Sequence, residues 1–533
     1  MTYVITQSCC KDASCVAVCP VDCIGPIGAP GGSTDSEMLY IDPAACIDCG
    51  ACVQECPVGA IYHQDEVPPG QQRFVDINAR YFQLHPSAAG PPAPRRDHAP
   101  VLPGSLRVAI VGAGPAGCYA AGELIRIDGV QVAMFERLPT PYGLLRAGVA
   151  PDHQHTKAIA DLFDTTLSHP RLQCHLNVAV GRDLTHHELL AHHHAVIYAT
   201  GASTSRDLGL PGEHLPGSHT AAEFVGWYNG HPDHADAEFD LSGQRAVIIG
   251  NGNVALDIAR IMLTEPDELA RTDIAQHAVD ALSTSAIREV VILARRGLRD
   301  AAFSVGEFLA LGDLDGVDVI IEDADLEDTP GDDAETALKV DIAREFAHRT
   351  PTPTRKRIVF RFLTTPVEIV GDTRVEALHV RGPGGHTVVI ETSLLLRSIG
   401  YRSTPIPGVP FDPASGRIPH GNGRVHDHDG KPTPGIYVTG WIKRGPQGVI
   451  GTNRACAEQT VTRLWTDFDN GLLTRDIGEP TALADLLAER GVHPLSWQDW
   501  CAIEAAERQR GLHSSRPRAK FVRIADALAA AQK

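Results

Sequence analysis

The sequence predicts a small α+β module rich in cysteine, followed by two doubly wound α/β domains. Nine of the thirteen cysteines lie between Cys9 and Cys56, which sets the first module apart. Further along, a pattern of apolar strand, glycine-rich turn and helix occurs twice, beginning at Val108 and at Ala246. This pattern is the opening unit of a doubly wound sheet, so two copies predict two such domains.

Composition and charge narrow the range of functions. The chain has 533 residues and a formal net charge of −19, which disfavours binding to nucleic acid or to an anionic membrane surface. It has no run of about 20 apolar residues, so no membrane-spanning helix is expected. The first residues lack the basic and apolar regions of a secretory signal. We expect a cytoplasmic protein.

The cysteine module contains an internal repeat. Its second half has the spacing Cys46-x2-Cys49-x2-Cys52-x3-Cys56-Pro57, which is typical of bacterial proteins that hold two iron–sulfur clusters. Its first half has the same spacing with one substitution, Cys9-x2-Asp12-x2-Cys15-x3-Cys19-Pro20. The two halves are offset by 37 residues throughout. The repeat therefore predicts two clusters.

The spacing also predicts which residues hold each cluster, because the fourth cysteine of each half crosses over to the other cluster. We call the two predicted sites site A and site B. Site A has four thiolates, from Cys19, Cys46, Cys49 and Cys52. Site B has three thiolates and one carboxylate, from Cys9, Cys15, Cys56 and Asp12.

A carboxylate holds iron less firmly than a thiolate. We therefore expect a 4Fe–4S cluster at site A and a 3Fe–4S cluster at site B, with a 4Fe–4S cluster ligated by Asp12 as the alternative. Cys10 and Cys23 lie outside the repeat and are expected to be buried, although Cys10 could compete with Cys9 as a ligand. Zinc is a weaker alternative, since a zinc site does not explain the repeated Cys-Pro.

The first glycine turn predicts an FAD site. It reads Gly112-Ala113-Gly114-Pro115-Ala116-Gly117 and lies between a strand and a helix. Glycines at this spacing let the backbone approach a pyrophosphate, which then lies at the helix N-terminus. Glu136 ends the next strand, where a carboxylate accepts hydrogen bonds from ribose hydroxyls.

The second glycine turn predicts an NADP site. It reads Gly250-Asn251-Gly252-Asn253-Val254-Ala255, and the next strand ends at Arg295 and Arg296 rather than at an acid. Two guanidinium groups bind a 2′-phosphate, whereas a carboxylate would repel it. No Cys-x-x-Cys follows Cys56, which excludes the flavoenzymes that use a redox disulfide.

Four longer motifs carry a family resemblance. They are Pro141-Tyr-Gly-Leu-Leu-Arg146, Gly148-Val-Ala-Pro-Asp-His153, Gly250-Asn-Gly-Asn-Val-Ala-Leu-Asp257 and Gly440-Trp-Ile-Lys-Arg-Gly-Pro446. With these motifs, residues 106 to about 465 resemble the ferredoxin–NADP reductases of the adrenodoxin-reductase type. The module before them resembles the seven-iron bacterial ferredoxins. The whole chain is similar to actinobacterial fusions of the two.

The resemblance implies roles by position. It places against FAD the residues Ala116, Glu136, Leu144, Val180, Trp441, Gly448, Val449 and Ile450. It places against NADP the residues Asn251, Gly252, Asn253, Val254, Arg295, Arg296, Glu307 and Gly448. His153 and Glu307 are candidates for a catalytic polar pair near the flavin–nicotinamide contact; alternatively, both only orient the substrate.

The resemblance also implies a domain order with glutathione-reductase-like FAD and NADP domains. We expect a ferredoxin domain at 1–64, a Pro/Gly-rich linker at 65–105, a discontinuous FAD domain at 106–213 plus 398–465, an NADP domain at 214–397 and a helical extension at 466–533. A basic cluster in that extension is interpreted as solvated surface; it comprises Arg508, Arg510, Arg516, Arg518, Lys520 and Arg523.

The implied activity is that of a ferredoxin–NADP reductase. NADPH gives a hydride to FAD, and single electrons then pass to the clusters, to an external ferredoxin, or to an acceptor such as a cytochrome P450 system. Up to Asp65 the module has one basic residue and eight acidic ones, and ferredoxins usually present such an acidic face to their reductase. Two alternatives are an electron-input subunit like that of glutamate synthase, and an electron-carrier or redox-sensing module.

Overall fold

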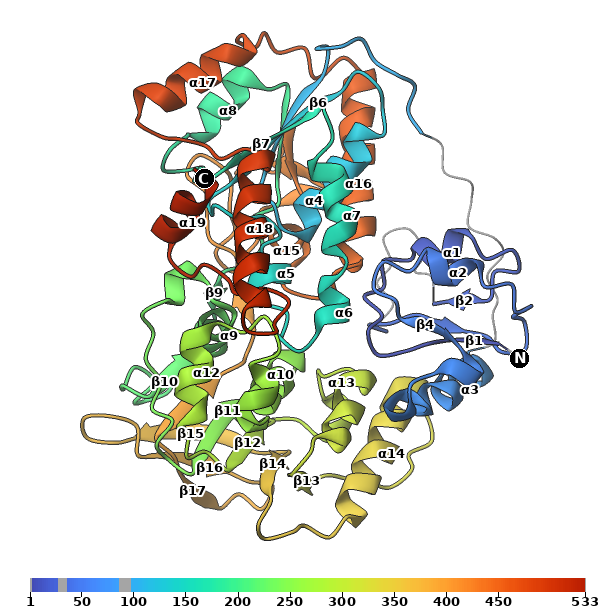
Figure 1. Ribbon diagram of the computed structural model, residues 1–533, viewed down its shortest axis with the longest axis vertical. Coiled ribbons are helices and arrows are strands. Elements are labelled where there is room, and N and C mark those ends of the chain that lie inside the picture. The colour runs from blue at the N-terminus through green and yellow to red at the C-terminus, as the bar shows by residue number, and fades with distance from the viewer. Residues whose placement is uncertain (1, 27–35, 86–96, 533) are drawn as a thin grey trace.

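A computed structural model describes residues 2–26, 36–85 and 97–532 (Figure 1). The cysteine module lies at one side of the molecule, beside two larger α/β domains stacked along its long axis. Among the described residues, no helix is long and apolar enough to cross a membrane.

The internal repeat is visible in the secondary structure of the cysteine module. β1 (Tyr3–Ile5) pairs antiparallel with β4 (Ile61–His63), and β2 (Ile24–Gly25) pairs antiparallel with β3 (Tyr40–Ile41). Each half contributes one short helix, α1 (Ser14–Ala17) or α2 (Ala51–Gln54), within its cysteine motif. These helices are offset by the same 37 residues as the cysteines.

The cysteine module extends beyond residue 64, so the expectation of a linker over the whole of 65–105 is wrong. Helix α3 (Arg73–Leu84) packs against the module with Phe74, Ile77 and Phe82 buried. Asn78 fixes it by accepting hydrogen bonds from the backbone N–H groups of Ile5 and Ile41 at 3.2 and 2.8 Å. The Pro-rich stretch at 90–94 lies outside the described residues.

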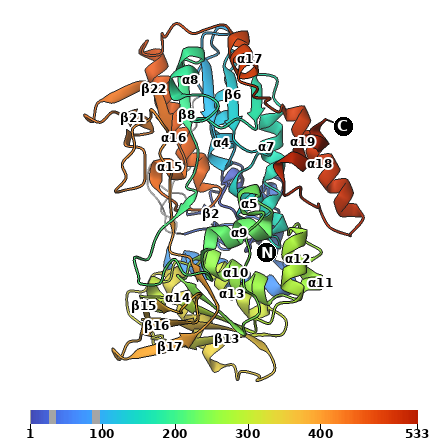
Figure 2. The ribbon, with the colours of Figure 1, turned by 90° about the vertical axis from the view of Figure 1, so that its left-hand side faces the viewer.

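The first α/β domain is built on a seven-stranded sheet with the order β20-β21-β22-β8-β5-β6-β7. Its parallel strands are β5 (Arg107–Val111), β6 (Gln131–Glu136), β7 (Leu172–Leu176), β8 (Ala195–Tyr198) and β22 (Pro432–Val438). The two-stranded edge, β20 (His420–Gly421) and β21 (Arg424–His426), is antiparallel. Helices α4 (Pro115–Ile125), α7 (Ala160–Leu167) and α16 (Thr452–Asp469) pack together beside this sheet (Figure 2). The sheet thus joins segments from both ends of the reductase-like region.

The second α/β domain has a six-stranded, wholly parallel sheet in the order β10-β18-β11-β12-β14-β13. Its strands are β10 (Ser218–Thr220), β11 (Arg245–Ile249), β12 (Glu289–Leu293), β13 (Val317–Glu322), β14 (Lys356–Arg361) and β18 (Leu394–Arg397). Its described helices include α9 (Ala221–Asn229), α10 (Asn253–Leu263), α12 (Gln276–Ser283), α13 (Val305–Ala310) and α14 (Ala334–His348). The central strands are apolar and buried on both faces, as covered parallel strands should be. A smaller antiparallel sheet of β15 (Thr365–Val370), β16 (Ala377–Arg381) and β17 (Thr387–Glu391) adjoins it.

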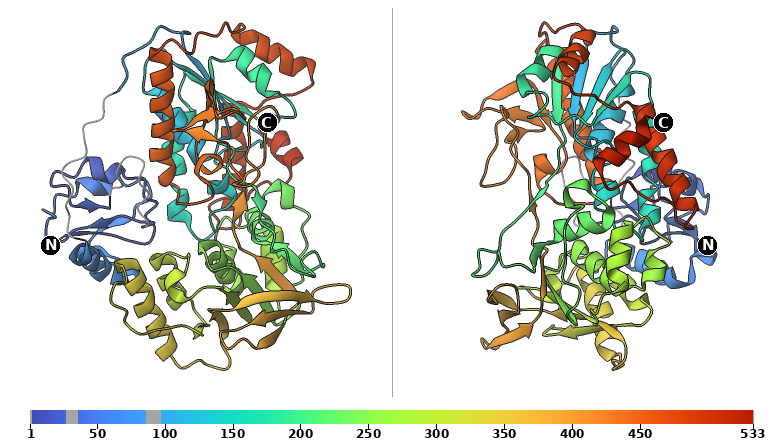
Figure 3. Two further views of the ribbon diagram at one scale, coloured as in Figure 1. Left: turned by 180° about the vertical axis from the view of Figure 1, so that it is seen from behind. Right: turned by 60° about the vertical axis from the view of Figure 1, so that its left-hand side comes forward.

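The chain ends in three helices, α17 (Pro480–Glu489), α18 (Trp497–Leu512) and α19 (Ile524–Ala531). The interpretation of the basic cluster here as solvated surface is wrong for Arg516 and Lys520, which are both buried. The Nζ of Lys520 lies 3.0 Å from Asp273 of the second domain and 3.2 Å from the carbonyl oxygen of Arg146 of the first. The terminal segment therefore ties the two α/β domains together (Figure 3).

Candidate functional site

The first glycine turn has the geometry of a phosphate-binding loop. Gly112 has φ +106°, and a Cβ on it would lie 2.6 Å from the carbonyl oxygen of Ala199. A Cβ on Gly117 would lie 2.0 Å from the carbonyl oxygen of Gly112. Gly114 precedes α4, whose N-terminus thus opens toward the turn. Only glycine fits at these two positions, and the free N–H groups of the helix suit an anion.

Glu136 is oriented by the backbone of the same region. Its carboxylate accepts hydrogen bonds from the N–H groups of Ala113 at 3.0 Å and Leu138 at 3.1 Å. Burial raises the pKa of Glu136, although both hydrogen bonds act in the opposite direction. The side chain is thereby fixed one strand away from the glycine turn, where a ribose bound to that turn would lie.

Several residues assigned to FAD by resemblance also lie close to this turn. A Cβ on Gly440, the neighbour of Trp441, would lie 2.6 Å from the Cβ of Ala116. A Cβ on Gly143, the neighbour of Leu144, would lie 3.1 Å from the Cα of Gly114. Val180 lies two residues beyond Val178, whose N–H donates to the carbonyl oxygen of Glu136 at 2.8 Å. Ile450 packs against the core of this domain, and Gly448 and Val449 precede it.

The second glycine turn repeats the geometry of the first. Gly250 has φ +113°, and a Cβ on it would lie 2.0 Å from the carbonyl oxygen of Ser398. Gly252 then precedes α10, which starts at Asn253. The Asn253 side chain accepts a hydrogen bond from the N–H of Ser304 at 2.7 Å and donates one to Glu37 of the cysteine module at 2.8 Å. This contact with Glu37 was not predicted from the sequence. Asn251 and Val254, the other predicted nucleotide residues here, are half-buried.

Arg295 and Arg296 follow β12 and are both exposed. Arg296 lies 3.4 Å from Asp300 in a solvent-screened pair, which costs little to rearrange. Both guanidinium groups are thus available to a ligand that binds along the same sheet edge as the Gly250 turn.

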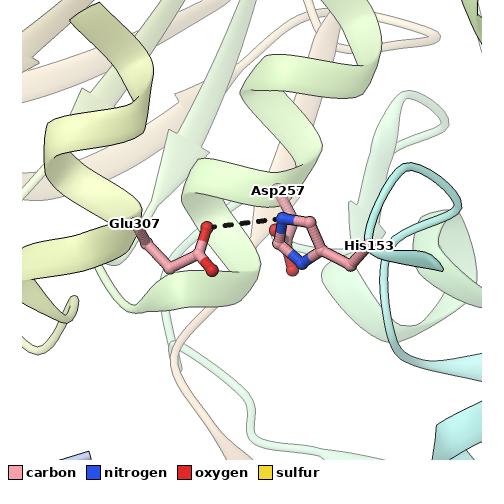
Figure 4. A group of neighbouring side chains, drawn as sticks. All are labelled: His153, Asp257 and Glu307. Carbon is pink, nitrogen blue, oxygen red and sulfur yellow. Dashed lines mark ion pairs between the residues drawn. The ribbon is translucent and has the colours of Figure 1, made fainter. Parts of the chain in front are cut away.

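The structure brings His153 and Glu307 together from the two α/β domains (Figure 4). The Nε2 of His153 lies 3.7 Å from a carboxylate oxygen of Glu307, and Asp257 of α10 lies beside them. The residue that sequence reasoning missed is Arg260. Its Nη2 contacts the Nε2 of His153 at 2.9 Å, and Asp257 at 2.7 Å.

Arg260 is the centre of this charged group. It also pairs with Asp152 at 2.5 Å and with Glu307 at 3.3 Å, and it is almost fully buried. Burial alone would lower the pKa of Arg260, but the surrounding carboxylates hold it well above its usual value. Arg260 thus brings one positive charge to three carboxylates, those of Asp152, Asp257 and Glu307. The i, i+3 spacing from Asp257 is the only sequence signal that could have indicated it.

The four thiolates predicted for site A line one cavity. Cys19 comes from the first half of the repeat, and Cys46, Cys49 and Cys52 come from the second. Burial raises the pKa of Cys52 to about 11, so iron must displace its proton on binding. Cys49 is exposed, and the cavity opens at the surface of the module.

The residues predicted for site B are packed against the first α/β domain. Cys9 and Cys56 contact the same hydrophobic cluster as Ile450 and the core of that domain, whereas Cys19 and Cys46 do not. Burial raises the pKa of Cys9 to about 11 and also raises that of Cys15. Both sets of donors therefore fit iron–sulfur clusters in two different environments.

Asp12, the fourth predicted ligand of site B, forms hydrogen bonds with residues of the first α/β domain. The Asp12 carboxylate accepts hydrogen bonds from the Tyr119 hydroxyl at 2.6 Å and from Arg454 at 3.1 Å. Next to it, the N–H of Gly451 donates to the carbonyl oxygen of Cys10 at 2.8 Å. Tyr119, Gly451 and Arg454 all belong to the first α/β domain, so Asp12 connects the two units.

The cysteines do not converge as they would on a single metal ion. Ligand atoms on one zinc ion lie at most about 4.6 Å apart, given Zn–S bonds of ~2.3 Å. Within the described part of the chain, the only group of His, Cys, Asp or Glu ligand atoms this close is the one around His153. Cys10 and Cys23, which lie outside the repeat, are buried as expected.

Comparisons with known proteins agree with this arrangement. Residues 106–296 match the family described as pyridine nucleotide-disulphide oxidoreductase, and residues 39–62 match the 4Fe-4S binding domain. The probable ferredoxin/ferredoxin–NADP reductase of Mycobacterium tuberculosis is 48% identical over 100% of this chain and 95% of its own length. Its counterpart in Mycobacterium leprae is 46% identical over 100% of this chain and 98% of its own length.

A solved structure covers the part that follows the cysteine module. The structure of M. tuberculosis FprA in complex with NADPH is 42% identical, has a TM-score of 0.76, and covers 80% of this chain and 100% of its own. The full-length relatives and this structure together place the chain in the family of ferredoxins fused to ferredoxin–NADP reductases.

Proposed function

We propose that this chain is a ferredoxin–NADP(+) oxidoreductase that carries its own ferredoxin. NADPH and FAD supply the hydride chemistry when bound, and iron–sulfur clusters supply one-electron chemistry. The observation that carries the proposal is the contact between Cys10 and Gly451. It joins the site B loop to Gly451, which directly follows the stretch 448–450 that the family places against FAD.

Each part of the chain has a defined role in this proposal. The first α/β domain holds FAD through the Gly112 turn and Glu136, and is formed by 106–213 plus 398–465. The second, 214–397, holds NADP through the Gly250 turn, Arg295 and Arg296. His153 and Glu307, which meet at the boundary between them, orient the nicotinamide. Residues 466–533 hold the two α/β domains together by contacting both of them.

The proposal extends to the cluster types. Site A, with four thiolates, holds a 4Fe–4S cluster. Site B holds a 3Fe–4S cluster, because Asp12 already has Tyr119 and Arg454 as partners and because carboxylate is the weaker iron ligand. The final acceptor is an external ferredoxin or another one-electron acceptor protein.

Anaerobic titration with NADPH tests the proposal. We expect bleaching of the flavin absorption, followed by the EPR signal of reduced clusters, in the full chain. If the clusters stay oxidised while the flavin is reduced, the chain does not use its own ferredoxin module. It would then act only as a flavin-dependent NADPH oxidase.

A double substitution tests the nucleotide assignment. Arg295→Ala with Arg296→Ala should raise KM for NADPH far more than KM for NADH, because each lost charge-assisted contact costs about 1.5–3 kcal/mol. The matched control is Arg288→Ala with Arg355→Ala, two exposed arginines near the opposite end of the same sheet. An unchanged NADPH preference in the first variant would refute the assignment.

A further inference from the structure

The two cluster sites have different access to the rest of the molecule, and this difference bears on where electrons leave. Site B is covered by the first α/β domain through Cys10 and Asp12, as described above. Three of the site A cysteines share a hydrophobic cluster with the core of the second α/β domain, namely Cys19, Cys46 and Cys52, but the segment that carries most of the site A ligands is open to solvent. Within it, residues 43–45, 47–49 and 53–55 are all exposed.

The exposed surface around site A is apolar at its centre. Val21 and Ile47, which line the site A cavity, are 37% and 58% exposed, and Val53 of α2 is 37% exposed. Large apolar side chains grouped at one spot on a surface mark interaction sites more often than scattered ones do. Here Val21 and Ile47 line the same cavity as Cys49, the one exposed cysteine of the site, and Val53 follows its ligand Cys52 in α2.

The rim of this surface is acidic. Asp48 lies 3.5 Å from His63, and Asp65 lies 3.7 Å from the same ring, so both carboxylates are on the same side of the module. Glu55 is also exposed. Residues 12–72 contain no lysine or arginine. Arg73, which lines a surface hollow together with Asp65, is paired with Glu345 instead.

We propose that this surface, made by Val21, Ile47, Val53, Asp48, Glu55 and Asp65, is the docking site for an external one-electron acceptor protein with a basic rim and an apolar centre. The proposal rests on the proposed function and adds where its electrons leave. Charge complementarity selects the partner, because an acidic rim steers a basic protein and repels an acidic one. The acceptor therefore docks at the site A end of the module and not on the α/β domain that covers site B.

Oxidised mitochondrial cytochrome c, which carries lysines around its haem edge, is a suitable probe. Overall, NADPH and two ferric cytochrome c molecules give NADP+, one proton and two ferrous cytochrome c molecules. We expect Asp48→Lys with Asp65→Lys to lower kcat/KM for cytochrome c roughly tenfold at low ionic strength, and to abolish most of its salt dependence. Ile47→Gln should raise KM for cytochrome c without changing the salt dependence.

Two controls make the result specific. Asp372→Lys with Asp429→Lys makes the same charge change at exposed positions of the two α/β domains, and should leave the cytochrome c rate unchanged. NADPH turnover with ferricyanide should be the same in all variants. If the unsubstituted chain does not reduce ferricyanide with NADPH, the proposed function itself is refuted. If it does, differences among the variants in the cytochrome c rate test the docking proposal alone.

A binding measurement gives an answer that does not depend on turnover. Carbodiimide cross-linking joins carboxylates to lysines in contact, and mass spectrometry of the cross-linked complex should identify Asp48, Glu55 or Asp65. Iron content and the EPR spectrum of the reduced site A cluster establish that each variant is intact. Cross-links confined to the α/β domains, or equal cytochrome c rates in all variants, would overturn the proposal.

Discussion

The loop of residues 9–15 and its repeat equivalent, residues 46–52, have the same length and the same spacing of ligands, yet they meet opposite surroundings. Cys10 packs against the first α/β domain and is only 4% exposed to solvent, whereas its equivalent, Ile47, is 58% exposed. The same fold element thus serves as an internal contact in one half and as free surface in the other. The difference comes from residues outside the motif, which the spacing does not constrain.

This comparison also corrects the expected role of the acidic residues. The resemblance implied that an acidic face meets the reductase. Asp12 does pair with Arg454 of the first α/β domain, but Asp48 and Glu55 are exposed on the other half of the repeat. Only part of the negative charge is used inside the molecule.

The strongest test of the comparison is to separate the docked loop from its domain. A Cβ on Gly451 would lie 2.1 Å from the backbone of Lys11, so Gly451→Ala should displace the loop. Electron transfer becomes slower as the donor and the acceptor move apart, so we expect cluster reduction by NADPH to slow several-fold in stopped-flow measurements.

The matched control for Gly451→Ala is Gly382→Ala, since a Cβ at Gly382 meets no atom within 4 Å. Reduction of ferricyanide by NADPH should be unchanged in both variants. Unslowed cluster reduction in Gly451→Ala would show that the docked loop is not the route into the module.

The next largest effect should come from the ion pair at Asp12. Arg454→Gln removes one of the two side chains of the first α/β domain that bind the buried Asp12 carboxylate, and only Tyr119 remains. We expect the contact between the cysteine module and this domain to weaken by about 1–3 kcal/mol, which is less than for a fully buried pair because Arg454 is partly exposed. Hydrogen exchange at the Gly451 amide should become faster. Arg463→Gln, in the same helix and also paired with an aspartate, should leave that amide protected; equal exchange in both variants would argue against the pair.

A single substitution can be compared at equivalent positions of the repeat. Val16 is 6% exposed and Val53 is 37% exposed. Val16→Ala should destabilise the module by about 2 kcal/mol, whereas Val53→Ala should cost less than about 0.5 kcal/mol. The two midpoints of anaerobic thermal unfolding provide the measurement, and equal shifts would mean that the two halves are not in different environments.

The smallest expected change concerns one iron atom. Asp12→Cys supplies the thiolate that site B lacks, so iron should rise from about seven to about eight per chain and the EPR signal of the oxidised three-iron cluster should weaken. Asp12→Asn should leave the iron content near seven. Iron near eight in the unsubstituted protein, with no three-iron signal after exposure to air, would identify Asp12 or Cys10 as a competent fourth ligand.

Much of the site was predictable because its chemistry depends on local spacing. The glycine turns must follow a strand and precede a helix, so Gly112 and Gly250 could be recognised from neighbouring residues alone. The same holds for the cysteine repeat, because each half has four ligand positions at fixed spacing within one short segment. The family membership followed from these motifs and was confirmed by the full-length relatives.

The residues that the sequence did not indicate act across long separations. Arg260 joins His153 to Glu307 only because two domains meet at that point. Helix α3 was mistaken for part of a linker because the Pro and Gly residues on either side of it suggested irregular structure. The helix is stable because Phe74 and Ile77 are buried against the cysteine module.

By itself, the sequence determined the kinds of chemistry this protein can perform, because ligand type, loop spacing and strand–turn–helix order are local properties of the chain. Only the tertiary structure decided which cluster site faces the α/β domain and which faces solvent. Both halves of the repeat satisfy the same local rules. Which of them is buried depends on contacts such as Cys10 with Gly451 and Asp12 with Arg454, which join residues more than 400 positions apart.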